Sequence, residues 1–321
     1  MSKYRIEPLD QDCDGDGFPE WDDHPLRGGF AGRLYPTVNS SHGDCSFQVI
    51  GPAGPVIRVR ATKGPDELSY WGLPMLLASK QGAESKHIRN GLSAALDHLT
   101  ELARNAGITR VVIGTGAGAE PDPLAAQLVD RMAEGTVQAS AMIDLTRPTD
   151  ALRADIRDSY RSLTNWGQRS IAMKYANALN PDRALFDLFP EFHAKVAGGR
   201  RRGDDYWGVY WDEIAAGRGE LALGRLEDGT LVAGSIVVWA GVTAYYASGV
   251  YDRDQFDKPL GHWPLWNTIL RAQEIGLARF DLGEIPARGH ASDKELNIAF
   301  FKRGFTSGRH LRLRWVLSVQ S

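Results

Sequence analysis

Short apolar runs of strand length alternate along the chain with longer segments of helical periodicity. Apolar runs over residues 46–50, 56–62 and 68–78 predict strands, and a Gly-Pro-Ala-Gly-Pro turn separates the first two. In segment 86–106, apolar residues recur every three or four positions, which predicts an amphipathic helix that ends at Gly107. The elements expected to complete the first half are a strand over 110–115, a helix over 123–134 and a strand over 137–145.

The pattern changes near residues 147–150, after which a similar order of elements follows. The helical stretches expected here are 150–177, 182–197 and 206–217. The strands that follow them are 220–226, 231–239 and 243–251, with Asp228–Gly229 as a hairpin turn. The last elements are a helix over 264–276, a strand over 278–284, a helix over 293–304 and a strand over 310–319.

The two halves share one plan: a strand meander, a helix, a strand, a helix and a closing strand. We therefore predict an α/β (α+β) protein of two side-by-side domains, each a mixed, mostly antiparallel sheet flanked by helices. The predicted domains are 1–146, which begins with an irregular acidic segment over 1–45, and 147–321. A length of 321 residues is too great for one small core and agrees with two domains.

Composition narrows the class of protein. The chain is 43% hydrophobic and 24% charged, with a net charge of −3, which is typical of a globular protein and argues against bulk binding of nucleic acid. A local basic groove remains compatible with that charge. The longest apolar stretch, near 235–241, is far shorter than the roughly 18 residues of a membrane span, and the N-terminal sequence is polar. Two cysteines, Cys13 and Cys45, favour a reducing cytoplasm.

The most specific residues lie in the second half. The string LWNTILRAQEIGLARFDLGE (265–284), followed by KELNIAFFKRGFTSG (294–308), resembles the C-terminal part of Fem-type transferases. These belong to the tandem-GNAT superfamily and attach amino acids to peptidoglycan precursors. The matching motifs are Trp266, Asp281–Leu282–Gly283 and Phe301–Lys302–Arg303–Gly304–Phe305. Glu284 and Thr306 depart from the family, which usually has glycine there. The resemblance covers about 150–315 and, in the order of elements only, 46–145.

The resemblance implies a reaction in which a neutral amine attacks an activated ester or thioester carbonyl. Lys302, beside Phe301, would then stabilise the developing oxyanion. The alternative is that Lys302 is a solvated cation that favours a helix C-terminus. Ser292 and Glu295 predict a capping box for this helix. Asp281 is expected to orient the amine or accept its proton, and the alternative is a structural hydrogen bond to the loop 285–292. Glu284 lies on the opposite strand face as a second acid or base.

The donor is the next question, and the loop 258–264 bears on it. A CoA enzyme of this fold holds pyrophosphate on backbone N–H groups of a glycine-rich loop, whereas here one glycine remains and Pro264 has no N–H. An aminoacyl-tRNA end would find stacking faces in His262, Trp263 and Trp266. For Trp266 the alternative is a core position on an amphipathic helix. The expected donor-binding residues are His262, Trp263, Trp266, Arg303 and Glu284.

Acceptor binding is expected to involve the densest positive cluster of the chain. Arg200, Arg201 and Arg202 suit the phosphates of a nucleotide-linked acceptor or of a tRNA backbone. Because Asp204 and Asp205 follow, a self-neutralised exposed loop is the alternative. The other expected acceptor contacts are Asn165, Trp166, Arg169 and Tyr246. For the three helical residues among them, helix packing is the default interpretation.

Several other motifs would indicate different functions, but the sequence matches them less well. Residues 12–23 fit the spacing of an EF-hand loop, with Asp12, Asp14, Asp16 and Asp23 as calcium ligands, but no amphipathic helix precedes them. We expect no other metal site, since neither cysteine has a zinc-type partner. The run 114–119 fits the loosest dinucleotide fingerprint, yet nearby acidic residues and prolines favour a turn. No hydrolase or P-loop motif occurs.

These observations favour a Fem-like aminoacyltransferase that moves an aminoacyl group from aminoacyl-tRNA to an amine of a cell-wall precursor or specialised metabolite. No tightly bound cofactor is expected; charged tRNA is the co-substrate, and the acceptor is a small-molecule or nucleotide-linked amine. The alternative is an acyl-CoA-dependent N-acyltransferase that acts on an amino sugar or another small amine. A catalytically silent binding module with the same fold is the third hypothesis.

Overall fold

The computed structural model describes residues 3–9, 17–18, 24–118, 122–255, 257–286, 289 and 291–320. The chain forms two compact units. The first comprises Met1–Asp23, Arg27–Gln138 and Leu311–Ser321, and the second comprises His24–Leu26 and Ala139–His310. The chain therefore passes between the two units at several positions, and none of these is the predicted boundary at 146/147. Strands β9 (Glu134–Asp144) and β15 (Arg309–Ser318) each begin in one unit and end in the other.

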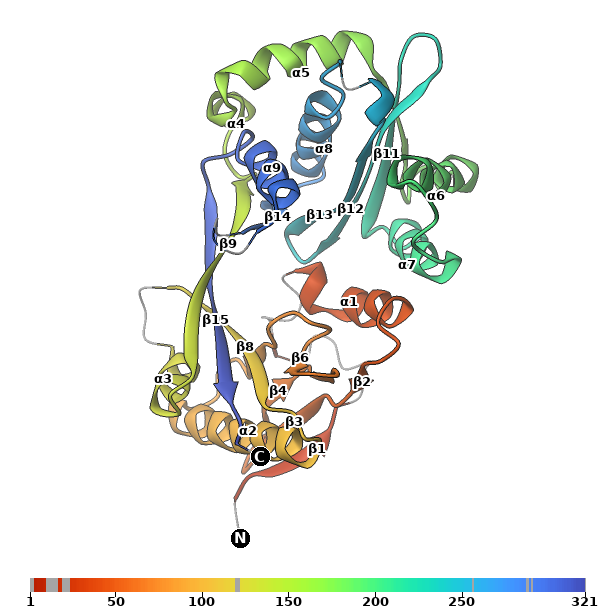
Figure 1. The fold of residues 1–321 in the computed structure, drawn as a ribbon. Helices are drawn as coiled ribbons and strands as arrows, with labels where there is room; N and C mark the ends of the chain where they lie inside the picture. The colour runs from red at the N-terminus through yellow and green to blue at the C-terminus, as the bar shows by residue number, and fades with distance from the viewer. Residues whose placement is uncertain are drawn as a thin grey trace. The chain divides into compact units, whose positions relative to one another are not determined.

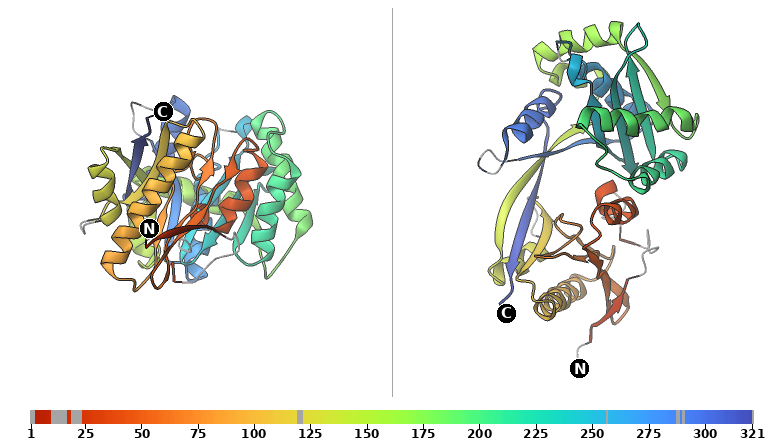
Figure 2. Two further views of the ribbon diagram at one scale, coloured as in Figure 1. Left: turned by 90° about the horizontal axis from the view of Figure 1, so that it is seen from below. Right: turned by 45° about the vertical axis from the view of Figure 1, so that its right-hand side comes forward.

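The first unit contains an antiparallel sheet of order β1-β3-β4-β7. Its strands are β1 (Arg5–Pro8), β3 (Phe47–Gly51), β4 (Gly54–Val59) and β7 (Leu77–Ser79). Helix α2 (Ser85–Asn105) packs on β3 and β4 and lies along them in Figure 2. The predicted apolar face of this helix is confirmed, because Leu92, Leu96 and Leu99 are fully buried. Gly107 follows the helix with φ of +69°, a conformation that glycine adopts without strain.

Shorter elements complete the first unit. They are α1 (Gly29–Leu34), η3 (Tyr35–Thr37), β2 (Gly43–Asp44), β5 (Thr62–Lys63), β6 (Leu68–Ser69), β8 (Arg110–Gly116) and α3 (Pro123–Asp130). Residues 312–318 of β15 pair antiparallel with β8. The expected strand over 68–78 is interrupted, because Trp71, with φ of 55°, turns the chain between β6 and β7.

The second unit is built on the strand order β10-β11-β12-β13-β14-β9. Its own strands are β10 (Ala172–Ala176), β11 (Gly219–Arg225), β12 (Leu231–Ala240), β13 (Thr243–Tyr251) and β14 (Arg279–Ile285). All neighbours are antiparallel except β13 and β14, which are parallel. The predicted mixed, mostly antiparallel sheet is therefore confirmed.

Helices cover both faces of this sheet (Figure 1). They are α4 (Thr149–Asp155), α5 (Asp158–Ser170), α6 (Arg183–Ala197), α7 (Asp204–Ala215), α8 (His262–Glu274) and α9 (Asp293–Lys302). Short 3-10 turns occur at η2 (Pro25–Arg27) and η4 (Arg253–Gln255). Helices α5 and α8 pack together on one face, and α6 and α7 lie on the other. Trp266 and Phe280 are fully buried in the core beneath α8.

The prediction of one helical stretch over 150–177 is wrong. Ile156 is extended (ψ of 134°), which ends α4, and Arg157 donates its backbone N–H to the carbonyl of Gly304. Residues 172–176 leave the helix and form β10, because the edge of β11 offers them a full antiparallel ladder. Tertiary pairing has here overridden the local helical pattern.

Strands β13 and β14 part after a short parallel pairing, and this separation positions the site. Pairing runs only from Thr243 and Arg279 to Tyr245 and Asp281. Gly283 then adopts φ of +90°, a conformation that other residues adopt only with strain, and the register of β14 against β9 shifts at the same place. Beyond the parallel pairing, residues 246 and 249–251 of β13 line a cavity, while Glu284 and Ile285 of β14 stay paired with β9.

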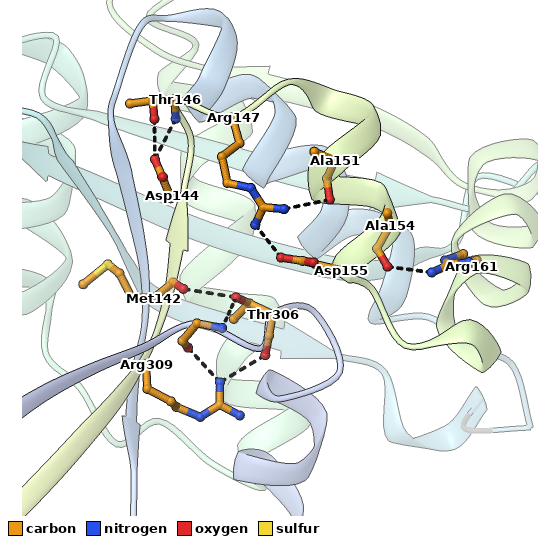
Figure 3. A network of polar contacts seen from close by, with 11 residues as sticks. Met142, Asp144, Thr146, Arg147, Ala151, Ala154, Asp155, Arg161, Thr306 and Arg309 are labelled. Atoms are coloured by element: carbon orange, nitrogen blue, oxygen red, sulfur yellow. Dashed lines mark hydrogen bonds and ion pairs between the residues drawn. The ribbon is translucent and has the colours of Figure 1, made fainter.

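A polar network fixes the chain that follows α9 (Figure 3). The Thr306 hydroxyl donates to the carbonyl of Met142 at 3.1 Å and accepts the backbone N–H of Gly308 at 2.9 Å. Arg309 donates to the carbonyls of Thr306 and Gly308 at 3.0 and 2.7 Å. Thr306 thus ties the chain after α9 to β9.

Candidate active site

Lys302 is the last residue of α9, and the start of that helix is fixed by the predicted capping box. The Ser292 hydroxyl accepts the backbone N–H of Glu295, whose carboxylate in turn accepts the backbone N–H of Ser292. Beyond the helix, Gly304 lies so close to Tyr160 of α5 that a Cβ there would be 2.0 Å from the ring. Both ends of α9 are therefore held, and with them the side chain of Lys302.

The Lys302 ammonium lies over the backbone where β14 diverges from β13. Its Nζ donates to the carbonyl of Glu284 at 3.4 Å and is 2.9 Å from the place where a Cβ on Gly283 would stand. Burial lowers the pKa of Lys302, and the charges of Asp281 and Glu284 oppose that effect. The ammonium is thus partly desolvated, which strengthens its interaction with an anion.

Lys302 opens onto a cavity of about 1040 Å³ within the second unit. Tyr246, Gly249 and Tyr251 of β13 form one part of its wall, and Asn297, Ile298 and Phe301 of α9 form another. The loop Lys258–His262 and the C-terminal part of α6 complete it. A volume of this size accommodates a substrate of cofactor size.

The cavity is strongly cationic. Its described lining includes Arg201, Arg253, Lys258, Lys294 and Lys302 and contains no carboxylate. Arg201, Arg253 and Lys294 form no ion pair with any described residue, while Lys258 lies 3.3 Å from the exposed carboxylate of Asp257. Cations left without partners in one concave site favour a polyanionic ligand.

Two tyrosines form part of the cavity wall. Their hydroxyls, those of Tyr246 and Tyr251, are 2.6 Å apart. Burial raises the pKa of Tyr251 to about 12 and raises that of Tyr246 well above its ordinary value. Both phenols therefore stay protonated and act as hydrogen-bonding groups. Gly249 is required beside them, since a Cβ there would lie 2.0 Å from the Tyr246 hydroxyl.

His262, at the start of α8, is held by aromatic rings. Its ring meets those of Tyr160 and Phe301 edge-on, with centroids 4.4 and 5.4 Å apart. Its Nδ1 lies 3.4 Å from the carbonyl of Pro259. Burial lowers the pKa of His262, so the imidazole is neutral near pH 7.

Asp281 lies outside the described lining of the cavity. It is 3% exposed, its Oδ1 accepts the Gly283 N–H at 2.6 Å, and its Oδ2 lies 3.2 Å from Nε2 of His24. His24 is itself oriented by the Leu26 N–H, which donates to Nδ1 at 3.1 Å. These contacts favour a positioning role in which Asp281 holds the Gly283 turn under Lys302. Glu284, the second expected acid or base, has an exposed side chain and contributes its carbonyl.

The two tryptophans expected at the donor site pack inside the protein. Trp266 is 2% exposed in the core, which contradicts its expected role as a stacking face and favours the core alternative. Trp263 packs on α5, where a Cβ on Gly167 would be 2.4 Å from its own. Its indole N–H is buried without a partner in the described part of the chain. Of the expected donor residues, the structure brings His262 to the cavity, while Arg303 caps α9.

The expected acceptor residues are divided. Arg201 and Tyr246 line the cavity. Arg200 is exposed and pairs with Asp204 at 3.2 Å, and Arg202 lies over the Tyr206 ring. The three α5 residues lie elsewhere: Asn165 accepts from Arg153, Trp166 packs near Ile171, and Arg169 lines a separate hollow with Asp228.

Sequence reasoning missed several cavity residues. They are His193, Arg253, Lys258, Lys294 and Asn297. A signal for one of them exists, because residues 294, 298 and 302 recur every four positions and so share one face of α9. Residue 253 begins the short turn η4 and residue 258 lies in the segment before α8, so no periodicity marks them, and the folded chain brings them into the same cavity as Lys302.

Metal and membrane features concern the residues that the structure describes. The calcium loop Asp12, Asp14, Asp16 and Asp23 lies outside those residues. Within them, no group of three His, Cys, Asp or Glu side chains has the arrangement of a metal site. None of the described helices is both long and apolar enough to cross a bilayer.

The chain is similar to known proteins in sequence over one domain and in fold over nearly its whole length. Residues 151–295 match the acetyltransferase (GNAT) domain family. No curated protein sequence matches the chain. Among solved structures, FemX is similar over 98% of this chain and 97% of its own, with 14% identity and a TM-score of 0.67. L-PGS from Bacillus licheniformis is similar over 91% of this chain and 87% of its own, with 13% identity and a TM-score of 0.57.

A tandem GNAT protein from the clavulanic acid biosynthesis pathway, solved without acetyl-CoA, covers 99% of each chain at 14% identity and a TM-score of 0.55. The chain thus has the tandem-GNAT fold, and its residues 151–295 match the GNAT domain family. Its fold is also similar to that of FemX, which agrees with the resemblance seen in the motifs around Asp281 and Lys302.

Proposed function

We propose that this protein is an aminoacyltransferase that moves an aminoacyl group from aminoacyl-tRNA to an amine, forming an amide bond. The acceptor we propose is an amine of a cell-wall precursor or of a specialised metabolite, and the reaction belongs to the cytoplasm, where charged tRNA is made. The observation that carries the proposal is the Lys302 ammonium, partly desolvated and facing a cavity that is lined by cations.

Lys302 suits the stabilisation of an oxyanion. When an amine attacks an ester carbonyl, negative charge develops on the carbonyl oxygen, and a fixed cation beside that oxygen lowers the barrier. The ammonium is held by the Glu284 carbonyl and by the end of α9 and so needs little reorganisation. Phe301, its neighbour, lines the same cavity and packs on Tyr251 and His262.

The surrounding cations support a tRNA end as the donor. Arg201, Arg253 and Lys258 could contact the phosphates of a single-stranded acceptor end, which carries one negative charge per nucleotide. The loop that would hold the pyrophosphate of CoA is a poor cradle, because Pro264 has no N–H and Gly261 is the one glycine of residues 258–264.

The alternative is an acyl-CoA-dependent N-acyltransferase that acts on an amino sugar or another small amine. It is favoured by one observation: the N-terminus of α8 opens onto the cavity through Gly261 and His262, and helix N-termini bind phosphate. The Lys302 chemistry would be the same with a thioester.

The two donors can be distinguished by one pair of experiments. Radiolabelled aminoacyl-tRNA is incubated with the protein and a panel of amines, and acetyl-CoA binding is measured by calorimetry. The proposal expects label in an amine product and no micromolar binding of acetyl-CoA. Micromolar acetyl-CoA binding with no labelled product would replace the proposal by the alternative.

A further inference from the structure

Amide formation by this site requires a base as well as an oxyanion donor. An amine at neutral pH arrives as an ammonium ion and attacks only after it loses a proton. The described lining of the cavity contains no carboxylate, and its arginines and lysines are of types that are protonated near pH 7. The raised pKa values of Tyr246 and Tyr251 keep both phenols protonated. Two histidines, His193 and His262, remain as neutral bases.

The surroundings of the two histidines differ. His193 lies on α6, with its ring 5.2 Å from that of Trp207, and the charges of Arg201 and Arg202 act on it. His262 packs edge-on against Phe301, the residue next to Lys302. Of the two imidazoles, His262 is therefore the one attached to the wall that carries the proposed oxyanion donor.

The contacts of His262 determine which of its nitrogens is basic. The Pro259 carbonyl beside Nδ1 can only accept a hydrogen bond, so Nδ1 carries the proton and Nε2 keeps its lone pair. Nε2 has no hydrogen-bond partner among the described residues. It is not one of the buried polar atoms that lack a partner. Contacts with Tyr160, Phe301 and Phe305 hold the ring in one orientation.

We infer that His262 is the general base of the transfer and receives the proton of the attacking ammonium on Nε2. The inference rests on the amide-forming reaction proposed above. The freed nitrogen lone pair attacks the ester carbon while Lys302 stabilises the oxyanion. The tetrahedral intermediate then collapses: the carbon–oxygen bond to the ribose breaks, and the departing oxygen takes the second proton of the nitrogen. His262 releases the first proton to solvent.

The charges that act on His262 keep it in the basic form. Burial is the main cause of its lowered pKa; the hydrogen bond with the Pro259 carbonyl opposes it, and the charge of Arg157 at the start of α5 acts in the same direction as burial. Tyr160 from α5 contacts its ring, and the other titratable groups in the described lining of the cavity are His193, Arg201, Tyr246, Tyr251, Arg253, Lys258, Lys294 and Lys302. None of them is an acid that would hold the imidazole protonated at neutral pH.

The test measures transfer rates from charged tRNA, and separately from acetyl-CoA, for the wild type, His262→Gln and His262→Asn across pH 5–9. The wild-type rate should rise with pH to a plateau through an apparent pKa below 6.5. Both variants should be about 100-fold slower or more, since general bases contribute that order. Both variants should lose the acidic limb of the pH–rate profile, and added imidazole should restore part of their rate. His98→Gln on α2, where burial also lowers the histidine pKa, is the matched control and should keep the limb.

Each outcome has a distinct meaning. Rescue of the rate by imidazole demonstrates that the site of the variant is folded. A variant that has unfolded is recognised by its circular dichroism and by the absence of rescue in both substitutions. If the wild type transfers from charged tRNA and His262→Gln keeps its rate and limb, the inference on His262 is overturned and the proposed function stands. If only acetyl-CoA is used, the proposed function fails and the same variants decide the role of His262 with that donor. No transfer from either donor overturns both.

Discussion

Lys302 is the residue on which the proposed chemistry depends most. Removing one preorganised donor to a developing oxyanion costs roughly 2.7–4 kcal/mol, or about 100- to 1,000-fold in rate. We expect Lys302→Ala to lower single-turnover transfer by that factor and to leave donor affinity within a few fold. Lys86→Ala, an exposed lysine in the first turn of α2, is the control and should not change the rate. A Lys302→Ala protein with the wild-type rate would remove Lys302 from the mechanism.

The protonation of Lys302 should appear in the alkaline part of the pH profile. Its pKa is lowered from 10.5 by burial, so the ammonium loses its proton at a lower pH than an ordinary lysine. Activity should therefore fall as pH rises through that lowered pKa. Lys302→Arg keeps its charge and should lose this limb, whatever its absolute rate. The measurement is the rate of transfer above pH 8, corrected for spontaneous hydrolysis of the ester.

At the residue scale, the sequence predicted which residues share the cavity better than it predicted which residues are buried. Lys302, Phe301, His262, Arg201 and Tyr246 do share one cavity. The aromatic character of Trp266 and the acidity of Asp281 suggested contact with substrate, but both are buried with structural partners. Residue type shows which reactions a side chain can perform, whereas exposure depends on tertiary packing that a single sequence does not display.

At the element scale, the contact between α9 and α5 should control the position of Lys302. A Cβ on Gly304 would lie 2.0 Å from the Tyr160 ring, so Gly304→Ala must displace α9 or α5. We expect a loss of at least 1–3 kcal/mol in the free energy of unfolding, the range for overpacking, together with slower transfer. Gly208→Ala is the matched control: it stands in α7 with nothing within 4 Å, and should stabilise by about 0.5–1 kcal/mol.

Urea unfolding of both glycine variants provides the measurement. A Gly304→Ala protein as stable and as active as the wild type would show that the close approach of α9 and α5 is not needed to place Lys302.

Elements with strong periodicity were predicted well, and those decided by pairing were not. Helices α2, α6 and α8 lie within two or three residues of their expected bounds, because each carries its own apolar face. The segment after α5 has helical composition but becomes β10, since β11 pairs with it. The divergence of β13 and β14 at Gly283 is also a property of the pairing rather than of either strand alone.

At the scale of the whole molecule, the near-neutral net charge and the cationic cavity lead to a salt-dependent affinity. Binding of a single-stranded tRNA end releases about 0.7 counterion for each phosphate that is contacted. We expect tRNA affinity to fall steeply with salt concentration, and Arg201→Ala or Arg253→Ala each to reduce the slope of log K against log salt by about that amount. Fluorescence anisotropy of an acceptor-end oligonucleotide measures this slope. A slope that is flat in the wild type would contradict a polyanionic donor.

The order of elements predicted a tandem GNAT-like chain, and the fold confirms it. The limits of the two units could not be inferred in the same way. Residues 312–318 pair with β8, which lies about 200 positions earlier, and no local pattern encodes that partnership. The sequence therefore predicts the last strand wholly in the second half, whereas most of it belongs to the first unit.

The most direct measurement is single-turnover transfer of a radiolabelled aminoacyl group from tRNA to a panel of amines, by the wild type and by Lys302→Ala. The account predicts a labelled amide product with the wild type, formed about 100-fold or more faster than with the variant. The account would be contradicted if the wild type formed no labelled amide while acetyl-CoA acylated the same amines, or if the wild type and Lys302→Ala formed the product at the same rate.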